Sequence, residues 1–91
     1  MFGAGKKKGT VRFSIKPQKG VKSVKLAGSF NDWQPVAMRK QAGGQYVSNI
    51  EVETGVYEYK FIIDNEWQQD PDNPQCVWNR HGTLNSVAII Q

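Results

Sequence analysis

The sequence predicts an all-β fold, specifically an antiparallel β-sandwich, and three observations support this prediction. Short segments in which apolar and polar residues alternate recur along the chain, as they do in half-buried strands. Turn-forming residues separate these segments at short intervals, and no segment has a helical apolar period of useful length. Roughly six or seven short strands of this kind are typical of two packed antiparallel sheets.

The most regular alternation lies in residues 56–63, which we expect to form a central strand. Its core-facing side is predicted to carry Tyr57, Tyr59, Phe61 and Ile63, and its outward side Glu58, Lys60 and Ile62. Val11, Phe13 and Ile15 share a face in the first expected strand, and Val24 and Leu26 are expected to point inward in the second. The expected strands are residues 10–16, 21–28, 45–52, 56–63, 66–69 and 83–90, with turns or loops at 17–20, 28–35, 41–44, 53–55, 64–65 and 70–82.

The 91 residues are enough for one domain with one modest core. Residues 1–9 are rich in Gly and Lys and are expected to be a flexible basic tail, followed by a single folded domain over residues 10–91. No apolar run approaches the ~20 residues of a membrane span, and no secretory signal is present. The lone Cys76 allows no internal disulfide. From these three observations together we expect a cytoplasmic protein without a membrane partner.

The net charge of +4 is unevenly distributed. Residues 1–40 hold ten Lys or Arg and one acid, whereas residues 41–91 hold two bases and seven acids. Such asymmetry has two explanations. The first is an anionic partner; the second is that Lys6–Lys8 form a solvated tail and the other bases occupy outward-facing strand positions. We favour the second explanation and expect no nucleic-acid partner, because no nucleic-acid-binding signature is present and the acids oppose phosphate binding.

The sequence offers little for catalysis or for a bound cofactor. The single histidine, His81, has no partner for a nucleophilic triad, and one Cys with one His cannot form a zinc site of the usual spacing. Asp64 and Asp70 stand in turn contexts where Asp is expected for backbone reasons. We therefore expect a binding protein rather than an enzyme, with no cofactor and no metal.

Three tryptophans, Trp33, Trp67 and Trp78, lie in loops or beside turns. Trp33 stands in GSFNDWQP, residues 28–35, among residues that favour turns. An exposed indole has a flat apolar face with an N–H at its edge, which suits a pyranose ring. We expect Trp33 and Trp67 to be exposed for binding, whereas Trp78 is expected to cap the core under its loop.

The segments VKLAGSFNDW (24–33), GVYEYKFIIDNEW (55–67), DPDNP (70–74) and GTLNSV (82–87) cover about two thirds of the chain. With these segments the chain resembles carbohydrate-binding module family 48, the glycogen- and starch-binding domain. That family includes modules of AMP-activated protein kinase β subunits, isoamylases and glycogen branching enzymes. The resemblance implies an immunoglobulin-like, early-set β-sandwich that binds α-1,4-linked glucan, such as glycogen, starch or maltooligosaccharides, on a shallow face.

The resemblance also implies which side chains contact the glucan, namely Trp33, Lys60, Trp67, Thr83 and Asn85. Kinase-type members have a leucine that inserts into the coil of the glucan, and this chain has His81 at that position. The preceding loop is one residue longer and carries Trp78. His81 and Trp78 are therefore further candidates for contact with the sugar.

A second hypothesis concerns domain packing. Many modules of this family are attached to a glycosidase and contribute mainly to packing between domains. The chain would then be a structural or interaction module that binds a protein partner, such as a glycogen-metabolising enzyme, and no sugar usefully. The sequence leaves the oligomeric state and the preferred glucan length open.

Overall fold

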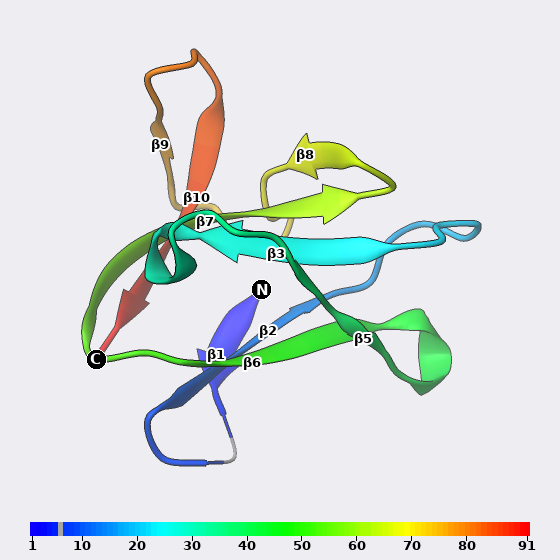
Figure 1. Ribbon diagram of the computed structural model, residues 1–91, viewed down its shortest axis with the longest axis horizontal. Coiled ribbons are helices and arrows are strands. Elements are labelled where there is room, and N and C mark those ends of the chain that lie inside the picture. Colours follow the sequence, from blue (N-terminus) through cyan, green and yellow to red (C-terminus); the bar gives the residue numbers. More distant parts are fainter. Residues whose placement is uncertain (6) are drawn as a thin grey trace.

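Two antiparallel sheets pack against each other in the computed structural model, which describes residues 1–5 and 7–91 (Figure 1). The first sheet has the strand order β1 (Phe2–Ala4), β2 (Thr10–Ile15), β6 (Tyr46–Glu51), β5 (Arg39–Lys40). The second has the order β4 (Val36–Ala37), β3 (Val24–Gly28), β7 (Gly55–Ile63), β10 (Leu84–Ile90), β9 (Cys76–Trp78), and β8 (Glu66–Gln68) also pairs with β7. Two short 3₁₀ turns, Ser29–Asn31 and Ala42–Gly44, complete the elements, and no helix of the described residues is long and apolar enough to cross a membrane.

Side chains from both sheets form the core, as the alternation predicts. On β7 the core side is Tyr59, Phe61 and Ile63, whereas Lys60 lies on the opposite face. The rings of Tyr59 and Phe13 meet edge to face, with centroids 4.9 Å apart. The all-β class and the antiparallel sandwich are therefore confirmed, while the immunoglobulin-like, early-set assignment stays a prediction.

Four short strands lie outside the predicted set, namely β1, β9 and the two-residue strands β4 and β5. Phe2–Ala4 form β1 and pair with β2, so this part of the predicted flexible tail lies in the sheet, where Phe2 packs against the core. The segment is too short and too rich in small residues to alternate visibly. Cys76–Trp78, predicted as loop, form β9 because β10 supplies a pairing edge. Lys6, the first of the three lysines predicted to be solvated, lies outside the described residues.

The edge of β7 is shared by two strands in succession, so the second sheet divides there. β10 pairs with Gly55–Tyr59, and β8 pairs with residues 61–63. The first part of β10, from Leu84 to Ser86, pairs with β9 and projects as a hairpin from the body of the sandwich (Figure 1). β8 and this hairpin therefore diverge, and β7 lies between them.

A buried polar network fills the place where the sheet divides. The Tyr59 hydroxyl donates to Asp70 Oδ2 at 2.6 Å and accepts from Asn73 Nδ2 at 3.0 Å. Asn73 Nδ2 also donates to the Val87 carbonyl at 2.8 Å, and the Asp70 N–H donates to Ser86 Oγ at 2.7 Å. Asp70 is only 1% exposed and also forms an ion pair with the amino-terminal group. The network thus fixes residues 70–73 to both β7 and β10.

Tyr59 makes the stability of the fold sensitive to alkaline pH. Burial, reinforced by the hydrogen bond to the Asp70 carboxylate, raises the pKa of the Tyr59 hydroxyl. Above about pH 10 the unfolded tyrosine loses its proton while the folded one keeps it, so the free energy of unfolding falls by about 1.4 kcal/mol per pH unit. We expect Tyr59→Phe to have a lower free energy of unfolding than the wild type at neutral pH. Above about pH 10, however, its free energy of unfolding should fall less steeply, because phenylalanine has no proton to lose.

Urea unfolding of the wild type and of Tyr59→Phe between pH 8 and pH 11 measures how the free energy of unfolding of each protein changes with pH. The other titrating groups are common to the two proteins, so the difference between the two curves isolates Tyr59. Parallel stability curves over that range would contradict the expectation.

Candidate functional site

The loop that carries Trp33 is held against β7 by close contacts. Gly28 has no room for a side chain, because a Cβ there would lie 2.7 Å from the Glu58 carbonyl oxygen. The Ser29 hydroxyl accepts a hydrogen bond from the Glu58 N–H at 3.0 Å, and the Phe30 ring packs against the core. These contacts fix the start of the loop relative to the middle of the sheet.

Trp33 itself has an unusual backbone conformation. Asp32 and Trp33 have φ values of 56° and 59°, a left-handed region that bulky residues rarely adopt. The Trp33 N–H donates to the Gly28 carbonyl at 2.9 Å, and the Asn31 side chain accepts from the Gly28 N–H and donates to the Gln34 carbonyl. The turn therefore holds the indole half-buried at the surface rather than in the core.

Trp67 lies on β8, directly after the Asp64-Asn65 turn. Both turn residues have positive φ, 48° and 72°, as in a type I′ hairpin. Asp64 Oδ1 accepts from two backbone N–H groups just before β3, each at 2.9 Å, which ties the turn to the neighbouring strand. Trp67 is paired with Ile62 and therefore lies on the face of β7 that also carries Lys60.

Trp33 and Trp67 form an aromatic pair on the outer side of the six-stranded sheet. Their ring centroids are 6.5 Å apart and their planes are inclined by 46°. Trp67 is 49% exposed and Trp33 is partly exposed. The expectation of exposure is confirmed for Trp67, whereas the expected exposure of Trp33 is only partial, because its loop is held against β7.

Beside the indoles, Lys60, Thr83 and Asn85 belong to one polar network. Lys60 Nζ donates to Thr83 Oγ1 at 2.9 Å, and Asn79 Nδ2 donates to the same oxygen at 2.7 Å. Asn79 Nδ2 also donates to Asn85 Oδ1 at 2.9 Å, and Asn85 Nδ2 donates to Glu58 Oε1 at 2.9 Å. Because the Thr83 oxygen accepts two hydrogen bonds, its own hydrogen remains available for a ligand.

Asn79 also shapes the turn that carries Arg80 and His81. Its side-chain oxygen accepts from the His81 N–H at 2.9 Å and from the Thr83 N–H at 3.1 Å. The backbone closes the same turn, with the Gly82 N–H donating to the Asn79 carbonyl at 3.2 Å. Gly82 supplies the left-handed φ of 80° that the turn requires. Arg80 and His81 are thus exposed on a turn of defined shape.

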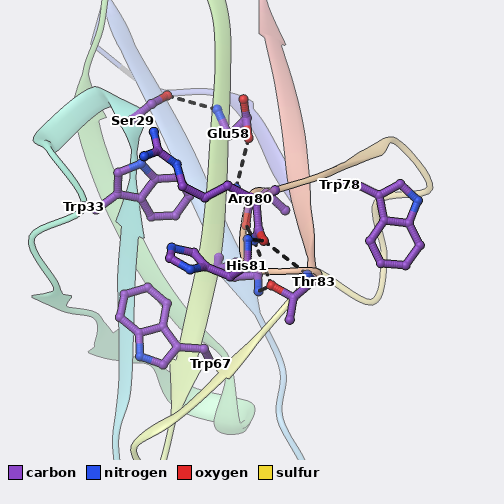
Figure 2. Close-up of a pocket in the computed structure, with 11 residues that line it drawn as sticks. Ser29, Trp33, Glu58, Trp67, Trp78, Arg80, His81 and Thr83 are labelled. Atoms are coloured by element: carbon purple, nitrogen blue, oxygen red, sulfur yellow. Dashed lines mark hydrogen bonds between the residues drawn. The ribbon is translucent and has the colours of Figure 1, made fainter.

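These elements surround a cleft of about 830 Å³ on the outer side of the six-stranded sheet (Figure 2). The structure brings together around it all the residues that the sequence singled out, namely Trp33, Lys60, Trp67, Trp78, His81, Thr83 and Asn85. The cleft is also lined by residues that the sequence reasoning missed, namely Ser29, Glu58, Asn79 and Arg80. The outward alternation shared with Lys60 could have identified Glu58, whereas the role of Asn79 depends on the turn geometry.

Trp78 corrects one expectation, because it does not cap the core. It is 73% exposed and lies on β9 opposite Leu84, which places it on the other face of the hairpin from Asn85. Figure 2 shows its ring pointing away from Trp33 and Trp67. Since the hairpin projects from the sandwich, the core does not extend to Trp78, which reaches only the rim of the cleft (Figure 1).

The arrangement suits a ligand that is apolar on its faces and polar at its edges. The indoles supply flat apolar surface, and the fixed hydroxyl, amide and ammonium groups supply hydrogen-bond donors beside it. A pyranose ring has these two properties.

Comparison with known proteins gives the family. Residues 11–91 match the family described as the glycogen recognition site of AMP-activated protein kinase, and the chain belongs to this family. It is 34% identical over 72 residues to the 5'-AMP-activated protein kinase subunit beta-1 of Sus scrofa, a match that covers 79% of this chain and 57% of that protein. The beta-2 subunit of Mus musculus is 32% identical over 77 residues, which cover 85% of this chain and 28% of that protein. The chain therefore spans between about a quarter and just over half of these relatives.

A solved structure has a similar fold. The crystal structure of a maltogenic amylase from S. marinus superposes with a TM-score of 0.74 at 28% sequence identity. The match covers 90% of this chain and 13% of the amylase chain. The fold thus recurs as a small part of a much larger protein.

Asn79→Ala tests whether one side chain organises the polar side of the cleft. Without its hydrogen bonds, the turn should open more often, because a typical intramolecular hydrogen bond contributes about 1 kcal/mol to stability and Asn79 forms four through its side chain. We expect hydrogen exchange of the His81 and Thr83 amides to become roughly tenfold faster, while exchange in β2 and β6 changes little.

Asn49→Ala, a change at an exposed position on β6, is the matched control and should leave these two amides unchanged. Unaltered exchange in Asn79→Ala would contradict the role assigned to Asn79.

Proposed function

We propose that this domain binds α-1,4-glucan without catalysis, with Trp33 and Trp67 as the surface on which glucose rings stack. One observation carries this proposal: the aromatic pair and a connected set of polar side chains line the same cleft. Family membership supports it, because the family is described as a glycogen recognition site.

Each site residue receives a role from its geometry. The C–H faces of the sugar rings stack on the two indoles, and the sugar hydroxyls meet the polar network. Thr83 donates its free hydroxyl hydrogen, while Lys60 and Asn85 donate the N–H groups that their partners within the protein leave unused. Because these side chains already hold one another, little side-chain entropy is lost when the sugar binds.

The resemblance implies that His81 stands where kinase-type members of the family have a leucine. Its exposed imidazole is flat and polar, so it contacts the edge of the glucan by stacking or hydrogen bonding instead of inserting as an apolar plug. Trp78, on the other face of the hairpin, remains outside the stacking surface.

Binding to short glucans is expected to be weak. A stacked ring contributes about 1 kcal/mol beyond plain burial, and only two indoles take part. The dissociation constant should therefore be on the order of micromolar to millimolar. A polymer such as glycogen compensates by offering many equivalent sites to one domain and to its neighbours.

Trp33→Ala and Trp67→Ala should each reduce co-sedimentation with glycogen by about tenfold, because each removes one stacking surface. Trp78→Ala is the matched control and should retain binding within about a factor of two, since Trp78 lies on the far face of the hairpin. Circular dichroism confirms that each variant is folded. Undiminished sedimentation of both the Trp33 and the Trp67 variants would contradict the proposal.

A packing role for the module is the second candidate. The similar fold occupies only 13% of the amylase chain, and Val56 and Ile89, which pair across β7 and β10, are exposed apolar residues outside the cleft. Such a surface suits a protein partner, and a cytoplasmic glycogen-metabolising enzyme is the partner we propose. A folded wild-type domain that does not sediment with glycogen would favour this second function.

A further inference from the structure

The basic residues of the second half of the chain gather in the cleft. Residues 41–91 contain only two Lys or Arg, Lys60 and Arg80, and both line it. The same segment contains seven acids, of which only Glu58 lines the cleft. The cleft is therefore a basic site within an otherwise acidic part of the sequence.

The charges in the cleft differ in how far they are already engaged. Lys60 donates to Thr83, and Glu58 accepts a hydrogen bond from Asn85. Within residues 1–5 and 7–91, neither the Arg80 guanidinium nor the His81 ring forms a hydrogen bond or an ion pair. These two side chains consequently retain all of their donors for a ligand.

The turn presents this pair in a defined place. The side-chain oxygen of Asn79 accepts from the His81 N–H, and the Gly82 N–H closes the turn on the Asn79 carbonyl. Figure 2 shows Arg80 and His81 on the side of the hairpin that also faces Trp33 and Trp67. A glucan that lies on the indoles would thus pass beside Arg80 and His81. A neutral sugar carries no negative charge that could pair with these two basic side chains.

We propose that Arg80 and His81 bind a phosphate group carried by the glucan, so that the preferred ligand is a phosphorylated α-1,4-glucan. This inference rests on the proposed function, because the indoles still bind the sugar rings. A phosphate monoester carries about −1.5 to −2 charges near pH 7 and has three strong acceptor oxygens. A guanidinium can bind two of these oxygens at once, with hydrogen bonds stronger than those to a neutral hydroxyl.

Isothermal titration calorimetry with maltoheptaose and with a maltoheptaose phosphate monoester tests the inference. We expect the wild-type protein to bind the phosphorylated sugar about tenfold more tightly at low salt, with the advantage shrinking as ionic strength rises. Arg80→Gln should lose most of this advantage, measured as the ratio of the affinities of the same variant for the phosphorylated and the neutral sugar. Arg39→Gln, which removes an exposed arginine from β5 on the other sheet, should keep the full advantage.

The outcomes separate this inference from the proposed function. Equal affinity for the two sugars, with neutral binding intact, would overturn the phosphate site alone. Failure of both sugars to bind would overturn the proposed function and the inference together. Sulfated dextran or inorganic phosphate binding as tightly as the phosphorylated glucan would also overturn the inference, because the site would then recognise charge without the glucan. An advantage that survives in Arg80→Gln would do the same.

Discussion

The hydrogen bond between the buried Tyr59 hydroxyl and the Asp70 carboxylate lies where the six-stranded sheet divides, and the site depends on it. β7 has one edge that two diverging strands share, β10 over Gly55–Tyr59 and β8 over residues 61–63. Without the Tyr59 hydroxyl at the point of divergence, the buried Asp70 carboxylate would lose a hydrogen bond. Leaving a buried polar group without a partner lowers the stability of the fold. The network fixes the segment between β8 and β9 and so determines the angle between the two branches.

The cleft lies on the opposite face of the same strand. Tyr59 points into the core, and Lys60, one residue later, points outward into the cleft. One branch supplies Trp67 from β8, and the other supplies Thr83 and Asn85 from the β9–β10 hairpin. Residues far apart in the sequence thus converge because they are attached to one central strand. Hydrogen bonds that link Lys60, Thr83 and Asn85, the last two through Asn79, hold the polar side of the cleft in place before any ligand arrives.

Much of this could be predicted from the sequence where local pattern and tertiary structure agree. The alternation of residues 56–63 placed Tyr59 and Phe61 inside and Lys60 outside, because a strand buried on one face imposes that period. The turn residues around Trp33 indicated that its indole would be kept out of the core. The pattern was silent on β1 and β9, since three-residue strands show no period and depend on a neighbouring edge. The sequence also misplaced Trp78. Its exposure depends on how far the β9–β10 hairpin projects from the sandwich, and no local pattern encodes that distance.

The most direct test of glucan recognition at the indole pair is intrinsic tryptophan fluorescence during titration with maltoheptaose and β-cyclodextrin, with cellohexaose as the control sugar. We expect a saturable change with both α-1,4-linked sugars and none with the β-1,4-linked one, because the Trp33 and Trp67 rings are partly exposed in the cleft and lose contact with water when a sugar stacks on them. The change should persist in Trp78→Ala. A folded protein whose fluorescence responds to none of these sugars, or equally to cellohexaose, would contradict recognition of α-1,4-glucan at this site.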